Sequence, residues 1–349
     1  MNYLKLVFII LILLFLIGGG FLIYDYFQST DEIIFNKSDI PDDATLPKEG
    51  SGKTVLFVGD IMLDRGVEYL IEKNDNVFYP FEKISQFLNS EDIVFGNLEG
   101  PINEEPQYFP DSSLRFSFSS EVIEGLISAN LNLLSLANNH TLNMGQEGLK
   151  ETRELLNNSG IDFVGDPVQC SQDFSFEKDN IKFLAINKTF HSNCENEEIV
   201  ETIKIVKLQS PDSFLVVYMH WGEEYQQNNS FLQEELAHQM IDAGVDLIVG
   251  SHPHVVQNIE IYKEKLIFYS LGNFVFDQYF SEETQESLAV KAEIKNDEFI
   301  CYLFPIRSSS AQPSLMKKEE SDEFLEDLAQ RSSEELTQQI KAGIIKVNL

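Results

Sequence analysis

Cysteine is scarce in this 349-residue sequence, which contains only three. Their odd number and wide spacing fit neither a disulfide framework nor a metal-binding motif, although one disulfide stays open, so cysteine usage leaves the redox compartment undecided. Positive charge is also scarce: 25 lysines and arginines face 57 aspartates and glutamates, for a formal net charge of −32. Surfaces that bind nucleic acid are basic, so this balance argues against nucleic acid as a partner.

One long apolar run stands near the start of the sequence. Residues 4–24, "LKLVFIILILLFLIGGGFLIY", carry a single charge, Lys5, and about 20 apolar residues are enough to cross a bilayer as a helix. A cleaved signal peptide has a shorter apolar region and a small-residue cleavage site, so residues 1–24 are predicted to be an uncleaved transmembrane anchor. Lys5 precedes the run and Asp25 and Asp31 follow it. We therefore expect a single-pass protein of the cell membrane with a cytoplasmic N-terminus and an extracellular body.

The rest of the chain divides into three parts by composition. Residues 25–53 mix acids, prolines and a Gly-Ser-Gly without a sustained period, which predicts an extracytoplasmic linker. Residues 54–306 alternate short apolar runs with amphipathic segments of 10–15 residues and then show several strands in succession. This pattern predicts an α/β fold with substantial parallel sheet and antiparallel pairing at one side. Residues 307–349 are polar and acidic, so we expect an appended, partly helical tail.

Polar residues stand at the ends of five predicted strands. These are Asp60 in "TVLFVGD", Glu99 in "DIVFGNLEG", Asn139 and His140 in "LNLLSLANNH", His220 in "SFLVVYMHWG", and His252 and His254 in "VDLIVGSHPH". Ligands of open α/β sheets bind at the carboxyl ends of the strands, so we expect these side chains on one rim. Imidazole together with carboxylate suits Zn, Mn or Fe, and one carboxylate can bridge two ions. The joint pattern predicts a site for one or two divalent metal ions.

Each of these motifs is weak when it is taken alone. Gly-Asp after a strand is common, "GNLEG" fits a simple turn, and "ANNH" fits a capping segment. A lone histidine on an amphipathic helix, such as His238, is expected to be a surface or packing residue. His191 lies in a polar loop without a strand end and is left out of the predicted site.

Six motifs in this order resemble a known family. They are "VGDIMLDR", "GNLEGPI", "LANNHTLNMGQEGL", "VYMHWGEEY", "IVGSHPHVVQ" and "SLGNFVFD". The likeness covers roughly residues 54–306 and is to the bacterial capsule-synthesis protein CapA family. That family includes the PgsA-type components of poly-γ-glutamate synthesis and is similar to the calcineurin-like metallophosphoesterases. The resemblance implies a four-layer αββα sandwich with mixed sheets, preceded by the transmembrane helix.

The resemblance also implies a role for each residue of the site. One metal ion would be held by Asp60, Glu99 and His254, and a second by Glu99, Asn139, His220 and His252. His140 would act on the substrate as an acid or charge stabiliser, and Arg65 and Asn273 would hold substrate.

The first motif departs from the pattern of the phosphoesterases, which have Asp-x-His there. Met62 stands where the histidine would bind, so the first metal position lacks one ligand. Asp64 is a candidate to compensate for it, but the more conservative interpretation is a solvated carboxylate at the start of a helix.

The function implied is an accessory role in capsule or poly-γ-glutamate synthesis, export or release, with a metal-dependent hydrolase-type site. Expected partners are the membrane, other membrane subunits of a polymer-synthesis complex, and an anionic polymer or phosphoester substrate. Two alternatives stay open: a metallophosphoesterase acting on nucleotides or cell-wall phosphodiesters, and a non-catalytic scaffold. An acidic body repels a polyanion at long range, although salt screens this beyond about 8–10 Å.

Overall fold

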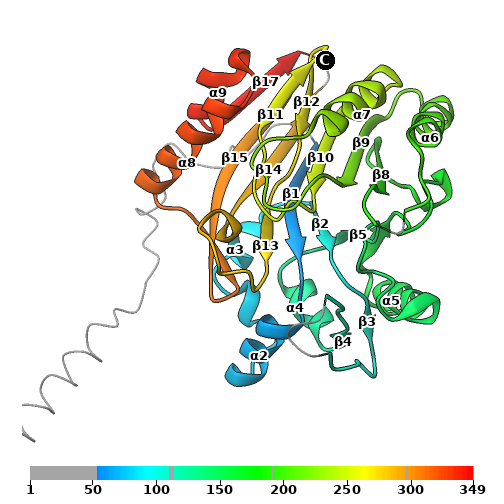
Figure 1. The fold of residues 1–349 in the computed structure, drawn as a ribbon, viewed down its shortest axis with the longest axis vertical. Coiled ribbons are helices and arrows are strands. Elements are labelled where there is room, and N and C mark those ends of the chain that lie inside the picture. The colour runs from blue at the N-terminus through cyan, green and yellow to red at the C-terminus, as the bar shows by residue number, and fades with distance from the viewer. Residues whose placement is uncertain (1–52, 110–113, 191, 296–297, 349) are drawn as a thin grey trace, which may run out of the picture. The chain divides into compact units, whose positions relative to one another are not determined.

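Two β-sheets packed face to face form the centre of the fold (Figure 1). A computed structural model describes residues 53–109, 114–190, 192–295 and 298–348. The first sheet has the strand order β16-β15-β14-β1-β2-β5-β6, with β13 also paired to β1 and β17 to β15. Its strands are β1 (Lys53–Ile61), β2 (Ile93–Leu98), β5 (Leu133–Ser135), β6 (Asp162–Val164), β13 (Asn273–Val275), β14 (Glu286–Ile294), β15 (Glu298–Ser309), β16 (Gln312–Leu315) and β17 (Ile344–Asn348).

The second sheet has the order β11-β12-β10-β9-β8-β7. Its strands are β7 (Phe176–Lys178), β8 (Ile181–Asn187), β9 (Phe214–His220), β10 (Leu247–Ser251), β11 (Ile259–Tyr262) and β12 (Lys265–Phe268). A small separate ladder joins β3 (Ile102–Asn103) to β4 (Phe118–Ser119). Strands β8, β9, β10 and β12 run parallel, as do β1, β2, β5 and β6 in the first sheet. Antiparallel pairing of β14, β15 and β16 at one side of the first sheet confirms that part of the prediction.

The helices are α2 (Arg65–Asn74), α3 (Ser85–Leu88), α4 (Val122–Ser128), α5 (Gly145–Ser159), α6 (Asn196–Gln209), α7 (Phe231–Asp242), α8 (Lys318–Arg331) and α9 (Thr337–Lys341). Those from α2 to α7 cover the outer faces of the sheets, whereas α8 and α9 pack against the cluster between the sheets. Helices α2 to α5 share a buried apolar cluster with the outer face of the first sheet. Helices α6 and α7 share another with the outer face of the second sheet. The described chain is therefore an α/β fold with mixed sheets, arranged in four layers.

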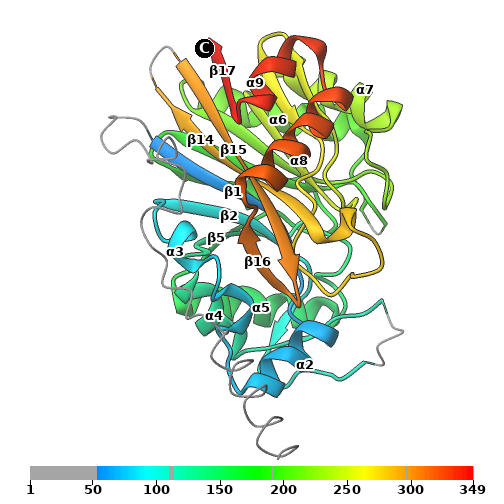
Figure 2. The same ribbon diagram turned by 90° about the vertical axis from the view of Figure 1, so that its left-hand side faces the viewer.

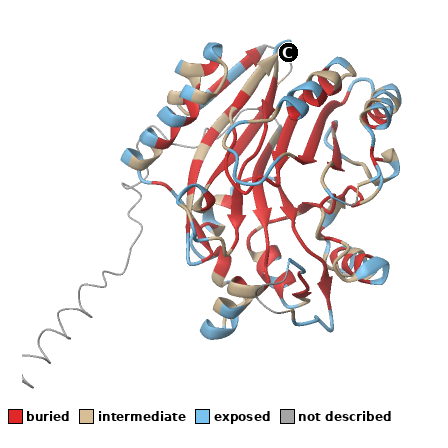
Figure 3. Ribbon diagram, viewed as in Figure 1, coloured by how far each residue is buried: buried red, intermediate tan, exposed pale blue. Residues whose placement is uncertain are grey.

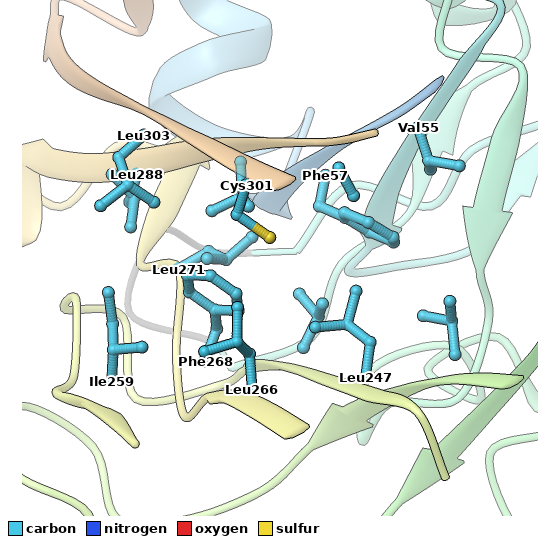
Figure 4. Packing of buried hydrophobic residues seen from close by; sticks show 14 of the residues in the cluster. Val55, Phe57, Leu247, Ile259, Leu266, Phe268, Leu271, Leu288, Cys301 and Leu303 are labelled. Atoms are coloured by element: carbon cyan, nitrogen blue, oxygen red, sulfur yellow. The ribbon is translucent and has the colours of Figure 1, made fainter. Parts of the chain in front are cut away.

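Strand β1 shows why its sequence is apolar without a break. Val55 and Phe57 point into the cluster between the sheets, whereas Leu56 and Val58 point into the cluster under the helices. A strand buried on both faces has no polar side, so period-2 alternation of polar residues is lost. Figure 3 shows the central strands as buried throughout, with exposed residues on the outer helices. Figure 4 shows Val55 and Phe57 facing Leu247 and Phe268 across the gap between the two sheets.

Close contacts fix the carboxyl end of β1, both to the residue before β13 in its own sheet and across to β9 of the second sheet. The backbone N–H of Asp60 donates to the carbonyl of Gly272 at 3.0 Å. A Cβ atom at Gly59 would lie 1.8 Å from that same carbonyl oxygen, so glycine is required there. The Tyr218 hydroxyl donates to the Val58 carbonyl at 2.8 Å across the core. These contacts hold the carboxyl ends of β1 and β9 beside each other.

Residues 307–348 differ from the appended tail expected from their composition. Strand β17 pairs with β15 along its length, and α8 and α9 lie beside these strands (Figure 2). Phe324, Leu328 and Ile340 are buried in the cluster between the sheets. The helical part of the expectation holds, but the segment completes the core. Its apolar residues are few and spaced along helices whose other faces are charged, so overall composition concealed them.

Three expectations concern residues that the structure describes only in part or not at all. The transmembrane span at residues 4–24, most of the linker and His191 all lie outside the described residues. Among the helices that are described, none is both long enough and apolar enough to cross a membrane. Residues 51–349 cluster as one compact unit.

Candidate metal centre

The polar residues predicted at five strand ends do meet. Asp60 is the second-last residue of β1, and Glu99 directly follows β2. His220 ends β9, while His252 and His254 follow β10, and Asn139 and His140 lie beyond β5. The strands come from both sheets, and their parallel runs end at the same edge. Placement at the carboxyl ends of parallel strands is thus the reason these side chains converge.

Two carboxyl groups, those of Asp60 and Glu99, lie fully buried at the bottom of the site. Asp60 is held on both oxygens: Asn97 Nδ2 donates to Oδ1 at 2.8 Å and the His252 backbone N–H to Oδ2 at 3.1 Å. Glu99 is different, because among the described residues no N–H or O–H group donates a hydrogen bond to either of its oxygens. A buried carboxyl group without donors is costly unless something else stabilises its charge.

Burial controls the ionisation of both acids. Desolvation raises the pKa of Asp60 from 3.8 to about 6, against the hydrogen bonds from Asn97 and His252 that lower it. Desolvation, followed by the nearby charge of Asp60, raises the pKa of Glu99 well above its usual value. Two buried acids side by side disfavour the doubly charged state. A cation between them would reverse that preference.

His220 bridges the two sheets within the site. Its Nε2 lies 2.8 Å from Asn139 Oδ1, and its Nδ1 lies 3.0 Å from Ser251 Oγ. The same Nδ1 is 3.9 Å from Asp60 Oδ1. The His220 ring is fully buried, so its orientation is fixed by these contacts. The amide oxygen of Asn139 and a ring nitrogen of His220 are thus in direct contact, and their role as two ligands of one ion stays a prediction.

The turn His252-Pro253-His254 has an unusual backbone. His252 has φ 96° and His254 φ 59°, both in a region that non-glycine residues seldom adopt. The two rings lie with their centroids 5.9 Å apart, and the His252 ring is 4.7 Å from that of His220. His252 Nδ1 is buried and has no hydrogen-bond partner among the described residues. Strained backbone that aims an unsatisfied nitrogen into a polar cluster is typical of a functional site.

His254 is oriented by Asn273. The Asn273 side-chain nitrogen donates to Gln278 Oε1 and to the Thr284 carbonyl, both at 3.1 Å, which leaves Oδ1 to accept from His254 Nδ1 at 2.9 Å. His254 Nε2 then faces Glu99 Oε1 at 3.8 Å as an acceptor. Asn273 was predicted to hold substrate, but it is buried and its polar atoms are bound within the protein. Its position fits a residue that orients a ligand histidine.

The three clustered histidines are all kept neutral. Desolvation lowers the pKa of His252 to about 4 and that of His254 to about 3, with neighbouring histidines adding to the effect. Burial likewise lowers the pKa of His220 well below its usual value. Neutral imidazole is the form that binds metal, so these rings are ready to act as ligands at neutral pH.

His140 lies at the mouth of the site, partly exposed. Its ring packs on Phe116 with centroids 4.3 Å apart, and Nε2 is 3.7 Å from Glu99 Oε1. Asn143 Oδ1 accepts the Phe116 backbone N–H at 2.7 Å and lies 3.1 Å from His140 Nδ1. This oxygen can only accept, so the network places a proton on Nδ1 and turns Nε2 towards the site. The position of Nε2 is compatible with proton exchange with a bound group, and the role of His140 stays a prediction.

Met62 and Asp64, which follow Asp60, take no part in the cluster. Met62 is fully buried among the apolar residues under the helices, and its sulfur accepts the Asp64 backbone N–H at 3.2 Å. Asp64 is the N-cap of α2 and accepts backbone N–H groups from Arg65 and Ser117. The helix-start role of Asp64 is confirmed, although this carboxyl group is buried rather than solvated.

Arg65 lies beside the site with its guanidinium group partly engaged, because its Nε is buried without a hydrogen-bond partner among the described residues. It pairs with Asp277, and its guanidinium carbon lies 4.9 Å from the centre of the Phe116 ring. The predicted contact of Arg65 with substrate stays a prediction. His238, outside the site, bonds Glu260 at 2.7 Å and stacks on Tyr262, which confirms it as a packing residue.

The donor atoms present fit a divalent metal ion. Asp60, Glu99 and His220 are buried and each offer one donor atom, and these atoms all lie within 4.8 Å of one another; exposed Glu224 with buried His252 and His254 makes a second group of the same spacing. Each group contains one residue with an unsatisfied buried atom, Glu99 in the first and His252 in the second. Oxygen and imidazole donors without internal partners are what Zn, Mn or Fe would need.

Sequence reasoning missed three residues of this site. Asn97 links Asp60 to Asn138, whose Nδ2 donates to Asn97 Oδ1 at 3.0 Å and whose Oδ1 accepts the His140 backbone N–H. Both asparagines lie inside motifs already noted, so their position at strand ends could have indicated that they belong to the site. Glu224 lies in an exposed loop, and only the fold shows that it approaches the histidines.

Comparison with known proteins identifies the family. Residues 54–278 match the family described as "Bacterial capsule synthesis protein PGA_cap". The chain therefore belongs to the bacterial capsule synthesis protein family.

Two relatives named for capsule or PGA biosynthesis are about one-third identical in sequence to this chain. The chain is 32% identical over 294 residues to the "Capsule biosynthesis protein CapA" of Bacillus anthracis, covering 76% of this chain and 70% of that protein. It is 33% identical over 285 residues to the "PGA biosynthesis protein CapA" of Bacillus subtilis strain 168, covering 75% and 73%.

Solved structures that align with this fold share much less sequence identity with the chain than these relatives do. TT1561 of Thermus thermophilus aligns over 69% of this chain and 94% of its own, with a TM-score of 0.39 and 12% identity. Purple acid phosphatase PPD1 from yellow lupin aligns over 78% of this chain and 54% of its own, with a TM-score of 0.37 and 12% identity. At these TM-scores neither likeness bears on the activity of this chain.

Proposed function

We propose that this chain is a membrane-anchored, extracytoplasmic accessory protein of capsule or poly-γ-glutamate synthesis, export or release, with a metal-dependent hydrolase-type site. The carrying observation is the buried cluster of two carboxyl groups and three neutral histidines, with unsatisfied atoms on Glu99 and His252. It occurs in a chain whose relatives are named for capsule and PGA biosynthesis. The family that these motifs resemble is in turn similar to the calcineurin-like metallophosphoesterases, which supports the same interpretation.

The residues of the cluster divide into ligands and a proton-handling group. Asp60, Glu99, Asn139, His220, His252 and His254 would hold one or two divalent ions, Mn, Zn or Fe. A bound ion of this kind polarises a phosphoryl or carbonyl oxygen and lowers the pKa of a water molecule. Asn97 and Asn273 fix the orientation of Asp60 and His254. In its doubly protonated form, His140 at the mouth would donate the Nε2 proton to a leaving group or stabilise developing charge.

Substitution of His140 separates chemistry from scaffolding. Because His140 lies at the mouth, we expect the His140→Ala protein to fold and to keep its metal, yet to lose capsule or polymer output in cells that lack the native protein. His238→Ala is the matched control, since His238 packs outside the site, and it should support normal output. Normal output from His140→Ala, in cells where deletion of the whole protein abolishes output, would rule out the hydrolase and favour a non-catalytic scaffold.

Location is the second part of the proposal. The apolar run at residues 4–24 and the acidic residues after it support a body outside the membrane, next to other membrane subunits of a polymer-synthesis complex. Protease added to intact protoplasts should then digest the residues from 54 onwards. Protection of that region in intact protoplasts, with digestion after lysis, would reverse the orientation.

A further inference from the structure

Glu224 lies where three loops of the site meet, although it is exposed. Its carboxylate and one ring nitrogen each of His252 and His254 all lie within 4.8 Å of one another. His252 and His254 are almost completely buried, so Glu224 covers them from the solvent side. Exposed acidic groups are common on a protein with 57 acidic residues, so proximity alone does not make Glu224 a ligand.

The backbone on both sides of Glu224 is fixed. Before it, the Trp221 indole donates to the Tyr269 carbonyl at 2.9 Å, and the Trp221 backbone N–H donates to the Ser251 carbonyl at 3.1 Å. Gly222 has φ 94°, and a Cβ atom there would lie 2.6 Å from the side chain of buried Gln233, so only glycine permits this turn. The loop therefore leaves β9 in one defined direction.

After Glu224 the chain is fixed to the histidine turn itself. The Tyr225 backbone N–H donates to the Pro253 carbonyl at 2.8 Å, between the two histidines. The Tyr225 ring lies with its centroid 6.0 Å from that of His254 and packs edge-on against Phe280 at 5.1 Å. Backbone hydrogen bonds of Trp221 and Tyr225 therefore fix the segment on both sides of Glu224. The approach of Glu224 to His252 and His254 follows from the position of this backbone.

The groups facing Glu224 lack a compensating positive charge. Asp60 and Glu99 lie behind the histidines, and Arg65, the nearby arginine, already pairs with Asp277. His252 Nδ1 and both oxygens of Glu99 are buried and unsatisfied among the described residues. The Glu224 carboxylate and the neutral rings of His252 and His254 form one group of donors, next to a second group made by Asp60, Glu99 and His220. A divalent cation would stabilise such an arrangement of carboxylates.

We infer that Glu224 is a metal ligand, which together with His252 and His254 supplies the donor that the buried Met62 cannot. Met62 directs its sulfur to the Asp64 backbone N–H and lies in the apolar cluster, so this part of β1 offers the ion nothing beyond Asp60. Glu224, which is exposed, approaches His252 and His254. His254 is the histidine predicted for the metal position in which Met62 leaves one ligand missing. The inference rests on the proposed metal site and adds a residue to it.

Titration of the full-length chain with Mn²⁺ tests this inference. Wild-type protein, stripped with chelator, should bind two ions in isothermal titration calorimetry. Glu224→Gln keeps the shape but loses the charge, so one of the two ions should be lost or bound at least about tenfold more weakly. Glu223→Gln is the matched control, because Glu223 is its exposed neighbour outside the donor group, and it should bind as wild type does.

The outcomes separate this inference from the proposed function. Two ions bound by wild type and by Glu224→Gln with equal affinity would overturn the role of Glu224 and leave the metal site intact. No ion bound by wild type would overturn both. Thermal unfolding of Glu224→Gln without metal should match that of wild type, since the side chain is exposed. A loss of metal in Glu223→Gln equal to that in Glu224→Gln would show a general effect of surface charge and would also overturn the inference.

Discussion

Two glutamates stand at the two ends of strand β2, and the protein treats them in opposite ways. Glu91, just before the strand, is buried and pairs with Lys291 at 2.7 Å, where the two side chains are 1% and 9% exposed. Glu99, just after the strand, is also buried, yet no described lysine or arginine pairs with it and no described donor satisfies its oxygens. Both acids lie in the same sheet and differ only in which end of the strand they flank.

The difference separates a structural charge from a functional one. A buried charge that serves the fold is paired, because an unpaired one costs several kcal/mol. Glu91 obeys this rule and Glu99 does not, so the ionised form of Glu99 is stable only if a cation from outside the chain pairs with it. The carboxyl end of the parallel strands is where such a partner binds in α/β proteins. The same logic applies to His252 Nδ1, which is also buried and has no hydrogen-bond partner among the described residues.

The largest effect should come from breaking the structural pair. Lys291→Met leaves the Glu91 carboxylate buried without a partner, so we expect the free energy of unfolding to fall by about 3–5 kcal/mol in urea titrations. Lys150→Met is the control: its pair with Glu154 is 67% and 62% exposed, and its loss should cost less than about 1 kcal/mol. A similar small loss in Lys291→Met would mean that burial does not distinguish the two pairs.

An intermediate effect should come from removing metal at the other end of β2. If an ion is present at about a hundred times its dissociation constant, it stabilises the folded state by about 2.7 kcal/mol. Chelator should then lower the unfolding free energy of wild-type protein by about that amount. Chelator should lower the unfolding free energy of the Lys291→Met protein by the same amount, because the substitution lies at the opposite end of β2 from the metal.

The His252→Ala protein completes this test. It lacks the unsatisfied nitrogen, so it should purify with little metal and respond weakly to chelator. His238→Ala should respond as wild type does. Equal metal content in His252→Ala and His238→Ala would show that the unsatisfied atoms do not mark a metal site.

The smallest effect should come from Met62. Leucine has a similar volume and Met62 is surrounded by apolar residues, so Met62→Leu should change the unfolding free energy by less than about 1.5 kcal/mol. Metal content, measured by elemental analysis, should stay at the wild-type value because the thioether does not face the ligands. Loss of metal in Met62→Leu would make the sulfur a donor and would contradict the role inferred for Glu224.

Much of the fold could be predicted from local patterns. The capping residue Ser230, with Gln233 three positions on, marks the start of α7, and Gly160 at φ 76° ends α5 where the sequence indicated. Long-range pairing could not be predicted in the same way. Strands near residues 259–268 and 286–309 look alike in sequence, yet they join different sheets. Neither periodicity nor composition specifies a partner strand.

The candidate site was predicted because its residues share one local property, a position at the end of an apolar strand. Glu224 and Asn138 were missed because their roles depend on the turn of a loop. Asn273 was assigned to substrate because its motif is near the rim, and only its hydrogen bonds show that it faces His254 instead. Direction of a side chain is decided by packing, which a motif does not contain.

The central position of β1 has a consequence for how the chain reaches its final state. This strand is the first of the folded unit to be synthesised, yet one flank pairs with β14, near the other end of the chain. Until β14 arrives, β1 keeps an open edge of apolar residues, and such edges favour aggregation. The match to the family model ends at residue 278, before β14. A chain that ended at residue 278 would contain every predicted metal ligand, but its strand β1 would lack the partner strand β14 and would keep an exposed edge.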